Sequence, residues 1–479
     1  MVLDYFREIS SVPRGSKNNK AISDFLVAFA RERGLRYYQD SAYNVVIYKD
    51  ASEGYENCPP LILQGHMDMV CEKTADSEHD FLTDPIDIVI ENNIIRAKDT
   101  TLGADDGIAV AYMLSILADD SIVHPPLEML ITSDEEIGML GAIELDKDCL
   151  TGRHMINIDS EDEGIFVCAC AGGIRTHFSW DIQRVPARGI GVKLEISGLQ
   201  GGHSGTDIDK NRSNAVMLAG RLLTYLSAVD FSIVDITGGN KDNVIPNECS
   251  VQLCIKSSDY DLFSAECAKY SELIVNELKS SEPGLEITVS IPDDTVVESD
   301  YMALSKDMQE KLIKLFNILP NGVHTMSADI CGMVESSSNL GIMRTEDDYV
   351  KVCVSVRSQK QSYIDYICKR LSVIADVLDA TFDTAFGYPG WDIKPESDFR
   401  DMLCSVYRDM TGKEPEVTSI HAGLEGGVFY EKMPDMDIVS IGPDVRNVHT
   451  VNEYADIASV QRVYEYLRCV TETFAEKYR

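Results

Sequence analysis

Four short segments of the chain carry histidine or carboxylate residues where an expected strand ends or an expected helix begins. Imidazole and carboxylate groups are common zinc ligands, and a nitrogen and oxygen set without thiolate also suits manganese or cobalt. Because the carboxyl ends of strands in an open α/β sheet meet in one crevice, we expect the four segments to converge on a metal centre. Their polar residues are His66 and Asp68, Asp105 and Asp106, Glu135 and Glu136, and Asp159.

Carboxylates that converge without a cation would repel one another and raise each other's pKa. A bridging carboxylate can hold two ions about 3.5–4 Å apart, as two-metal hydrolases require. Asp68 lies two residues after His66 and could orient its ring through the second imidazole nitrogen. One residue of the Glu135 and Glu136 pair could act as general base on the attacking water. The positions alone leave open which of the two glutamates binds metal.

The elements that must position these residues alternate in type along the first third of the chain. Residues 60–64 (PLILQ), 127–132 (LEMLIT) and 155–158 (MINI) read as strands, and residues 107–117 read as an apolar helix. This alternation predicts an α/β domain with a mostly parallel sheet and helices on both faces.

From about residue 184 the pattern changes to strands that alternate apolar and polar residues. Such strands are expected at residues 190–197, 250–255, 285–291 and 349–356, with helices at 214–226, 262–278 and 302–316. They predict an inserted α+β domain with an antiparallel sheet. The expected organisation is a discontinuous catalytic domain, 1–184 and 387–479, interrupted by a lid or dimerisation domain at 185–386.

The charge and composition of the chain limit the molecules it can bind and the compartment in which it is expected. The net charge of −36 disfavours nucleic acid and anionic membranes, because phosphate binding needs clustered basic residues. The thirteen cysteines are scattered, the N-terminal segment lacks the apolar core of a signal peptide, and no stretch approaches the ~20 apolar residues that span a bilayer. A cytoplasmic protein is expected. No P-loop, GxGxxG after a strand or GxSxG is found, which disfavours nucleotide-dependent enzymes and serine hydrolases.

Several motifs resemble those of the zinc metallopeptidases that include carnosinase, peptidase T and peptidase V. GHMDMV, LGADDG, SDEEIG and NIDSED carry this resemblance. GLQGGHSG, NVIPNE, SVRS, GYPGW, IHAGLEGG and the IGPD segment, in this order, resemble one branch over nearly the full length, the bacterial aminoacyl-histidine dipeptidases. The resemblance implies two divalent ions per chain, zinc foremost with manganese or cobalt as alternatives, and a homodimer.

The resemblance also assigns roles. It implies that Asp105 bridges the ions, that His66 and Asp159 complete one site, and that Glu136 and His449 complete the other. Asp68 and Glu135 are then the catalytic pair, His203 stabilises the oxyanion, and the peptide bond after Asp105 is expected to be cis. The implied substrate-binding residues are Asn243, Arg357, His421, Glu425 and Gly426.

The expected function is hydrolysis of dipeptides, including Xaa-His types such as β-alanyl-histidine. Alternatives are a tripeptidase or an N-acyl amino acid amidohydrolase of the same superfamily and, in another class, a non-catalytic binding or scaffold protein. Cysteine is expected after the glutamate of the HAGLE segment, where this chain has Gly426. This departure leaves the metal ligands unchanged and bears on the shape of the substrate pocket.

Overall fold

The computed structural model describes residues 1–291 and 297–479. The chain divides into two compact units. The first unit consists of Met1–Cys170, Gly390–Ile420 and Leu424–Arg479, and the second of Ala171–Pro389 and His421–Gly423. The units therefore change after residues 170 and 389, where the sequence predicted domain boundaries after residues 184 and 386.

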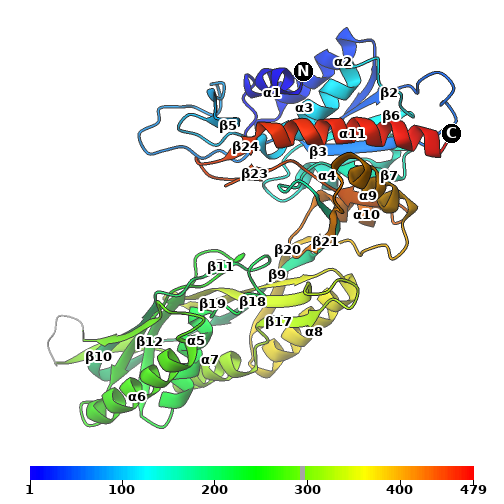
Figure 1. Ribbon diagram of the computed structural model, residues 1–479. Coiled ribbons are helices and arrows are strands. Elements are labelled where there is room, and N and C mark those ends of the chain that lie inside the picture. The colour runs from blue at the N-terminus through cyan, green and yellow to red at the C-terminus, as the bar shows by residue number, and fades with distance from the viewer. Residues whose placement is uncertain (292–296) are drawn as a thin grey trace. The chain divides into compact units, whose positions relative to one another are not determined.

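An eight-stranded mixed sheet forms the centre of the first unit (Figure 1). The inner pairs β6–β3, β3–β7 and β7–β22 are parallel, whereas β1–β2 and β2–β6 at one edge are antiparallel. In sheet order the strands are β1 (Arg36–Gln39), β2 (Val45–Lys49), β6 (Leu127–Thr132), β3 (Leu61–His66), β7 (His154–Asn157), β22 (Asp437–Ser440), β8 (Ile165–Cys170) and β21 (Glu416–Ile420).

Helices cover this sheet on both faces. Leu61 and Leu63 of β3 belong to a large apolar cluster shared with five helices, and α11 runs along the sheet (Figure 1). Ile62 and Leu130 are equally buried but lie outside that cluster, because alternate residues of a strand point to opposite faces. The helices of the cluster are α1 (Val2–Ser10), α2 (Lys20–Glu32), α3 (Ala104–Ala118), α9 (Asp398–Thr411) and α11 (Ile457–Lys477). The shorter α4 (Leu140–Glu144), η1 (Lys147–Cys149) and α10 (Glu425–Lys432) complete the unit.

A small antiparallel sheet of the first unit was not predicted from the sequence. Its strand β24 (Tyr454–Asp456) pairs with β23 (Val445–Arg446) on one side and with β5 (Ile94–Ala97) on the other, and β5 pairs with β4 (Ile88–Glu91). The strands are only two to four residues long and lack a clear alternating pattern. This sheet fixes the segment between β23 and β24, which carries His449 and Glu453.

The second unit contains a ten-stranded sheet with helices on one side (Figure 1). Its strand pairs are antiparallel. The main path is β15 (Glu286–Ser290), β10 (Val185–Ser197), β14 (Cys249–Ile255), β12 (Phe231–Gly238), β18 (Val334–Thr345), β19 (Tyr349–Ser358), β9 (Gly172–Asp181) and β20 (Thr381–Tyr388), with β16 (Glu298–Ala303) on β10 and β17 (Gly322–Met326) on β18. The helices are α5 (Ala215–Leu226), α6 (Tyr260–Leu278), α7 (Lys306–Ile318) and α8 (Gln361–Val377), and β11 (Gly202–His203) pairs with β13 (Val244–Ile245).

The predicted fold class is confirmed, with one local correction. The helix expected from residue 302 begins at Lys306, because the Ser305 side chain accepts the N–H of Met308 and caps it. Residues 298–303 instead form β16, which pairs with β10. Within the described residues, no helix is long and apolar enough to cross a membrane.

Candidate metal centre

His66 ends strand β3, and its two ring nitrogens face different groups. Nδ1 lies 3.1 Å from the backbone oxygen of Asp68 and 3.4 Å from its carboxylate. Nε2 lies 3.1 Å from Oδ1 of Asp105 and 3.5 Å from Oδ1 of Asp159. The imidazole is therefore held from behind by Asp68, more closely through its backbone oxygen than through its carboxylate, and points Nε2 toward two carboxylates.

Asp105 lies at the start of α3, where the chain departs from helical geometry. Its φ of −77° and ψ of 109° are non-helical, and the peptide bond to Asp106 is cis, as expected from the resemblance. Its Oδ1 faces His66, whereas its Oδ2 lies 3.2 Å from Nε2 of His449. One carboxylate thus faces two histidines that come from opposite ends of the sequence.

Glu136 lies in the loop after β6 and also faces His449. The Nε2 atom of His449 lies 3.1 Å from Oε1 and 3.0 Å from Oε2 of Glu136. One ligand atom from each of Asp105, Glu136 and His449 falls within 4.8 Å of the others. The same criterion groups His66 with Glu135 and Glu136, so Glu135 borders the centre beside its neighbour.

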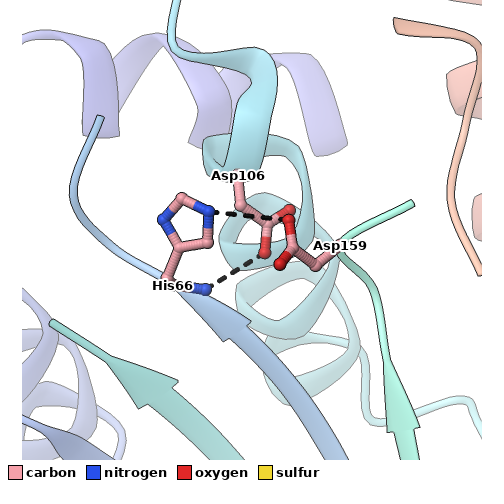
Figure 2. Close-up of side chains that lie close together, drawn as sticks. All are labelled: His66, Asp106 and Asp159. Atoms are coloured by element: carbon pink, nitrogen blue, oxygen red, sulfur yellow. Dashed lines mark hydrogen bonds and ion pairs between the residues drawn. The ribbon is translucent and has the colours of Figure 1, made fainter. Parts of the chain in front are cut away.

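Asp159 and Asp106 flank His66 from two other elements (Figure 2). Asp159 follows β7, and its carboxylate faces the imidazole; Asp106 accepts the backbone N–H of His66 at Oδ2, over 3.0 Å. These three residues form a further group of possible ligands. Asp105 lies 3.1 Å from Nε2 of His66, closer than Asp159 at 3.5 Å, and also faces His449, whereas Asp106 binds the backbone of β3.

The electrostatics of the centre show a deficit of positive charge. Hydrogen bonds to Asp105 and Glu136 raise the pKa of His449 to about 11, despite its partial burial. Burial raises the pKa of Asp159 to about 6 and that of Glu135 well above its ordinary value. Burial would lower the pKa of His66, but Asp159, Asp105 and Asp68 outweigh it and raise that pKa. The cluster therefore favours added positive charge.

This donor set fits two divalent ions. Each histidine faces two carboxylates through one ring nitrogen, and Asp105 offers a separate oxygen to each histidine. Nitrogen and carboxylate oxygen ligands in this number suit zinc and also manganese or cobalt. The predicted ligands His66, Asp105, Glu136, Asp159 and His449 are thus brought together around one carboxylate.

Glu425 and Gly426 begin α10 in the same unit. Glu425 is fully buried, and its Oε2 accepts hydrogen bonds from Gln64 at 2.6 Å and Thr132 at 2.7 Å. Burial raises the pKa of Glu425 to about 7. A Cβ atom at Gly426 would overlap Cζ3 of the Trp391 indole. Any side chain at this position, including the cysteine that the resemblance predicted, would therefore require the Trp391 ring to shift.

His203 and Asn243 lie together in the second unit. Ser204 donates its N–H to the backbone oxygen of Asn243 at 2.8 Å. The N–H groups of Gly205 and Thr206 point at Nδ1 of His203, over 3.3 and 3.2 Å. Burial, followed by the Arg357 charge, lowers the pKa of His203 to about 4. His203 is therefore neutral near pH 7, and its proton lies on Nε2.

Arg357 and His421 form the other predicted positions of the second unit. Arg357 ends β19, is buried, and donates from Nη1 to the Tyr388 hydroxyl. Nε2 of His421 lies 2.8 Å from the Ser337 hydroxyl. Burial, then the charge of Arg357, lowers the pKa of His421 to about 3. Nε of Arg357 is buried and has no hydrogen-bond partner among the described residues.

Three residues that contact the metal-binding segments have positions that the sequence did not predict. Asp106 was expected among the polar residues of the metal centre, and its carboxylate accepts the backbone N–H of His66 in β3. Arg14 and Glu453 lie in irregular segments, and both are buried against the turn before Asp105. No periodic pattern marks either one. The sequence around Arg14 and Glu453 therefore did not indicate that these two charged side chains are buried.

Comparison with known proteins agrees with this site and fold. Residues 62–473 match Peptidase family M20/M25/M40. The chain is 36% identical to the cytosol non-specific dipeptidase of Escherichia coli (strain K12) over 467 residues, which cover 97% of this chain and 95% of that protein. The crystal structure of aminoacylhistidine dipeptidase from Vibrio alginolyticus matches with a TM-score of 0.89 and 36% identity, covering 98% of this chain and 96% of that one. A Staphylococcus aureus tripeptidase shares the fold, with a TM-score of 0.56 and 16% identity over 99% of this chain and 98% of its own.

An α/β unit that gathers two histidines and several carboxylates at its strand ends, joined to an antiparallel α+β unit, defines the class as a metallopeptidase. The chain belongs to Peptidase family M20/M25/M40. The predicted enzyme class and the resemblance to aminoacyl-histidine dipeptidases are confirmed.

Proposed function

We propose that this chain hydrolyses short unblocked dipeptides, Xaa-His dipeptides among them, at a centre of two divalent ions. The observation that carries the proposal is the position of Asp105 between His66 and His449, with one oxygen toward each. Asp159 supports the first histidine and Glu136 the second. Zinc is the proposed ion, with manganese and cobalt as compatible alternatives. When bound, the ions would polarise the scissile carbonyl and lower the pKa of the attacking water.

Glu135 is the proposed general base and general acid. Its carboxylate borders the ligand cluster, and its backbone N–H is fixed by Asp68 at 3.0 Å. Burial raises the pKa of Glu135, so a proton taken from the attacking water is retained long enough to be passed to the leaving amine. Asp68 holds both the His66 ring and the loop that carries Glu135, and so positions the base relative to the ligands.

Residues of the second unit, together with Glu425 and Gly426 of the first, are proposed to act on the substrate. A neutral His203 with its proton on Nε2 can donate to the developing oxyanion. Arg357, buried and with Nε free of a hydrogen-bond partner among the described residues, suits the substrate carboxylate. Asn243, His421, Glu425 and Gly426 are proposed to shape the rest of the substrate site, Glu425 through the substrate amino group.

Two further properties are proposed from the resemblance. One is a cytoplasmic location, which the E. coli relative carries in its printed name. The other is a homodimer formed through the second unit. Tyr366, Val373 and Val377 of α8 are exposed and spaced so that they share one helix face, which supports such a contact. Light scattering after size exclusion would measure the mass directly, and a monomer of 53.2 kDa would contradict the dimer.

A substrate panel tests the proposed function. Purified protein with added Zn²⁺, Mn²⁺ or Co²⁺ would be assayed against β-alanyl-histidine, other Xaa-His dipeptides, alanyl dipeptides, tripeptides and N-acyl amino acids. We expect the highest kcat/KM with unblocked dipeptides. Higher kcat/KM with tripeptides or N-acyl amino acids would instead support the tripeptidase or the amidohydrolase.

A further inference from the structure

Glu453 binds four consecutive backbone N–H groups of the turn that ends at Asp105. Its Oε2 accepts from Leu102 at 2.8 Å and from Gly103 at 3.0 Å. Its Oε1 accepts from Ala104 at 2.8 Å and from Asp105 at 3.3 Å. Both oxygens of the buried Glu453 carboxylate thus bind the same turn of the backbone. These hydrogen bonds fix the position of the Asp105 backbone.

Glu453 also belongs to the segment that carries His449. It lies four residues after this histidine, and its backbone N–H donates to the oxygen of Thr450 at 3.1 Å. The next residue, Tyr454, starts β24, which is paired on both sides. The side chain of Glu453 therefore ties the His449 segment to the Asp105 turn, and His449 and Asp105 face each other at 3.2 Å.

Arg14 makes the corresponding link on the other side of the turn. Its Nη1 donates to the backbone oxygens of Met67 at 3.0 Å and Asp68 at 3.2 Å, both in the segment directly after His66. Its Nη2 donates to the backbone oxygen of Gly103. The guanidinium is almost fully buried, with 1% of the residue exposed, so these contacts occur without competition from water.

The two glycines of the LGADDG motif make room for this guanidinium. A Cβ atom at Gly103 or at Gly107 would lie 2.5 Å from Nη2 of Arg14. Gly103 also has a φ of +68°, a conformation that side chains rarely adopt. The motif is therefore shaped to seat Arg14 against the turn, in addition to supplying Asp105.

We propose that Arg14 and Glu453 are positioning residues that hold Asp105 at the correct distance from His66 and His449, respectively. Neither side chain is a proposed metal ligand. Each acts through the backbone, Arg14 by joining the His66 segment to the turn and Glu453 by joining the His449 segment to it. The inference rests on the proposed two-ion centre, and groups that orient metal ligands typically change metal affinity or activity by about 10–100-fold when they are removed.

Metal titration of substituted proteins tests this inference. Parent, Glu453→Gln and Arg14→Lys would be stripped with chelator and titrated with Zn²⁺ by calorimetry and with Co²⁺ by visible absorption. Gln keeps the shape of Glu453 but turns an N–H₂ group toward the backbone donors. Lys keeps the charge of Arg14 but lacks the two terminal N–H₂ groups that donate to separate backbone oxygens. We expect a rise of about tenfold or more in Kd for at least one ion and an altered Co²⁺ spectrum. With metal in excess, we expect kcat to fall while KM stays within about twofold.

Glu128→Gln is the matched control. Glu128 is also a buried carboxylate, 4% exposed against 3% for Glu453. It likewise accepts backbone N–H groups, those of Thr151 and Gly152, but on β6 away from the strand end that leads to Glu135. We expect this variant to lower the melting temperature without changing either Kd. An equal loss of metal affinity in Glu128→Gln would show a general packing effect and overturn the inference.

Two further outcomes separate the inference from the proposed function. A parent that binds two ions while Glu453→Gln and Arg14→Lys match it would overturn the inference alone. A parent that binds none would overturn the proposed centre and, with it, the inference. If Glu453→Gln does not fold, Glu453→Asp and Arg14→Lys serve instead. A parental Kd and a parental Co²⁺ spectrum in both variants would overturn the inference.

Discussion

The Oδ1 atom of Asp68 accepts the backbone N–H of Glu135 at 3.0 Å. The other oxygen accepts the Ser16 hydroxyl at 2.8 Å and faces the N–H of Glu136 at 3.4 Å. The Asp68 carboxylate therefore binds mainly the loop of Glu135 and Glu136. The backbone oxygen of Asp68 is its atom closest to the His66 ring. This residue connects the proposed base with a proposed ligand.

Replacing Asp68 with alanine should reduce both metal affinity and turnover. The loss removes the acceptor that fixes the Glu135 loop, and residues that orient ligands typically contribute about 10–100-fold. Steady-state kinetics and metal content would measure it. Ser16→Ala, which removes only one donor to the same carboxylate, should change turnover by much less. Parental activity in Asp68→Ala would contradict this role.

Replacing Glu135 with glutamine should abolish proton transfer while leaving the ligands in place. We expect turnover to fall by about three orders of magnitude with metal content unchanged. Asp134→Asn is a suitable control, because Asp134 lies in the same loop and its carboxylate accepts the Lys17 N–H and the Asn19 side chain. Near-normal turnover of Glu135→Gln would rule out Glu135 as the base.

The strand-end positions found from the sequence correspond to real contacts in the first unit. Residues after β3, β6 and β7 and at the start of α3 converge, because the apolar patterns of those elements are strong and their sheet order follows from parallel pairing. His449 could not be found this way. It lies between two strands of two to three residues, β23 and β24, whose position depends on long-range pairing with β5.

The same limit applies to residues that act through the backbone. Arg14 and Glu453 are charged residues in irregular segments, and only the three-dimensional contacts show that they are buried. The start of α7 was misplaced because residues 298–303 (ESDYMA) lack an alternating apolar pattern, and they form a strand by pairing with β10. The burial of Arg14, the burial of Glu453 and the start of α7 all depend on tertiary contacts, which a local sequence pattern does not contain.

Adding a methyl group at Gly426 should destabilise the first unit. A Cβ atom there would overlap the Trp391 ring, and inserting a methyl group into a packed site typically costs about 1–3 kcal/mol. Denaturant unfolding of Gly426→Ala would measure the change. Gly387→Ala is the control, since its Cβ would meet its nearest neighbour at an ordinary 3.7 Å. Equal stability of Gly426→Ala and the parent would show that the Trp391 ring can shift.

His421 should make stability fall as the pH decreases. Its pKa is about 3 in the folded chain, because of burial and the Arg357 charge, against an ordinary value of 6.5. Below pH 6.5 the unfolded chain takes up the proton first, so stability is lost from about pH 6.5 downward until pH falls to about 3. At pH 5 this amounts to about 2 kcal/mol.

The pH dependence of unfolding in His421→Gln would test this. The variant should show a smaller decrease in stability between pH 7 and pH 5 than the parent. At pH 7.5, where the histidine is neutral in both states, the difference between the two proteins reports packing alone. An identical decrease in both proteins would exclude His421 as its source.

We propose that Asp105 joins two metal sites that are both needed for peptide hydrolysis. Metal analysis coupled to a dipeptide assay, before and after chelation, tests it most directly. We expect two ions per chain, loss of hydrolysis on chelation, and recovery on adding Zn²⁺, Mn²⁺ or Co²⁺. In Asp105→Ala we expect both ions to be lost. Dipeptide hydrolysis that survives complete removal of metal would contradict the claim.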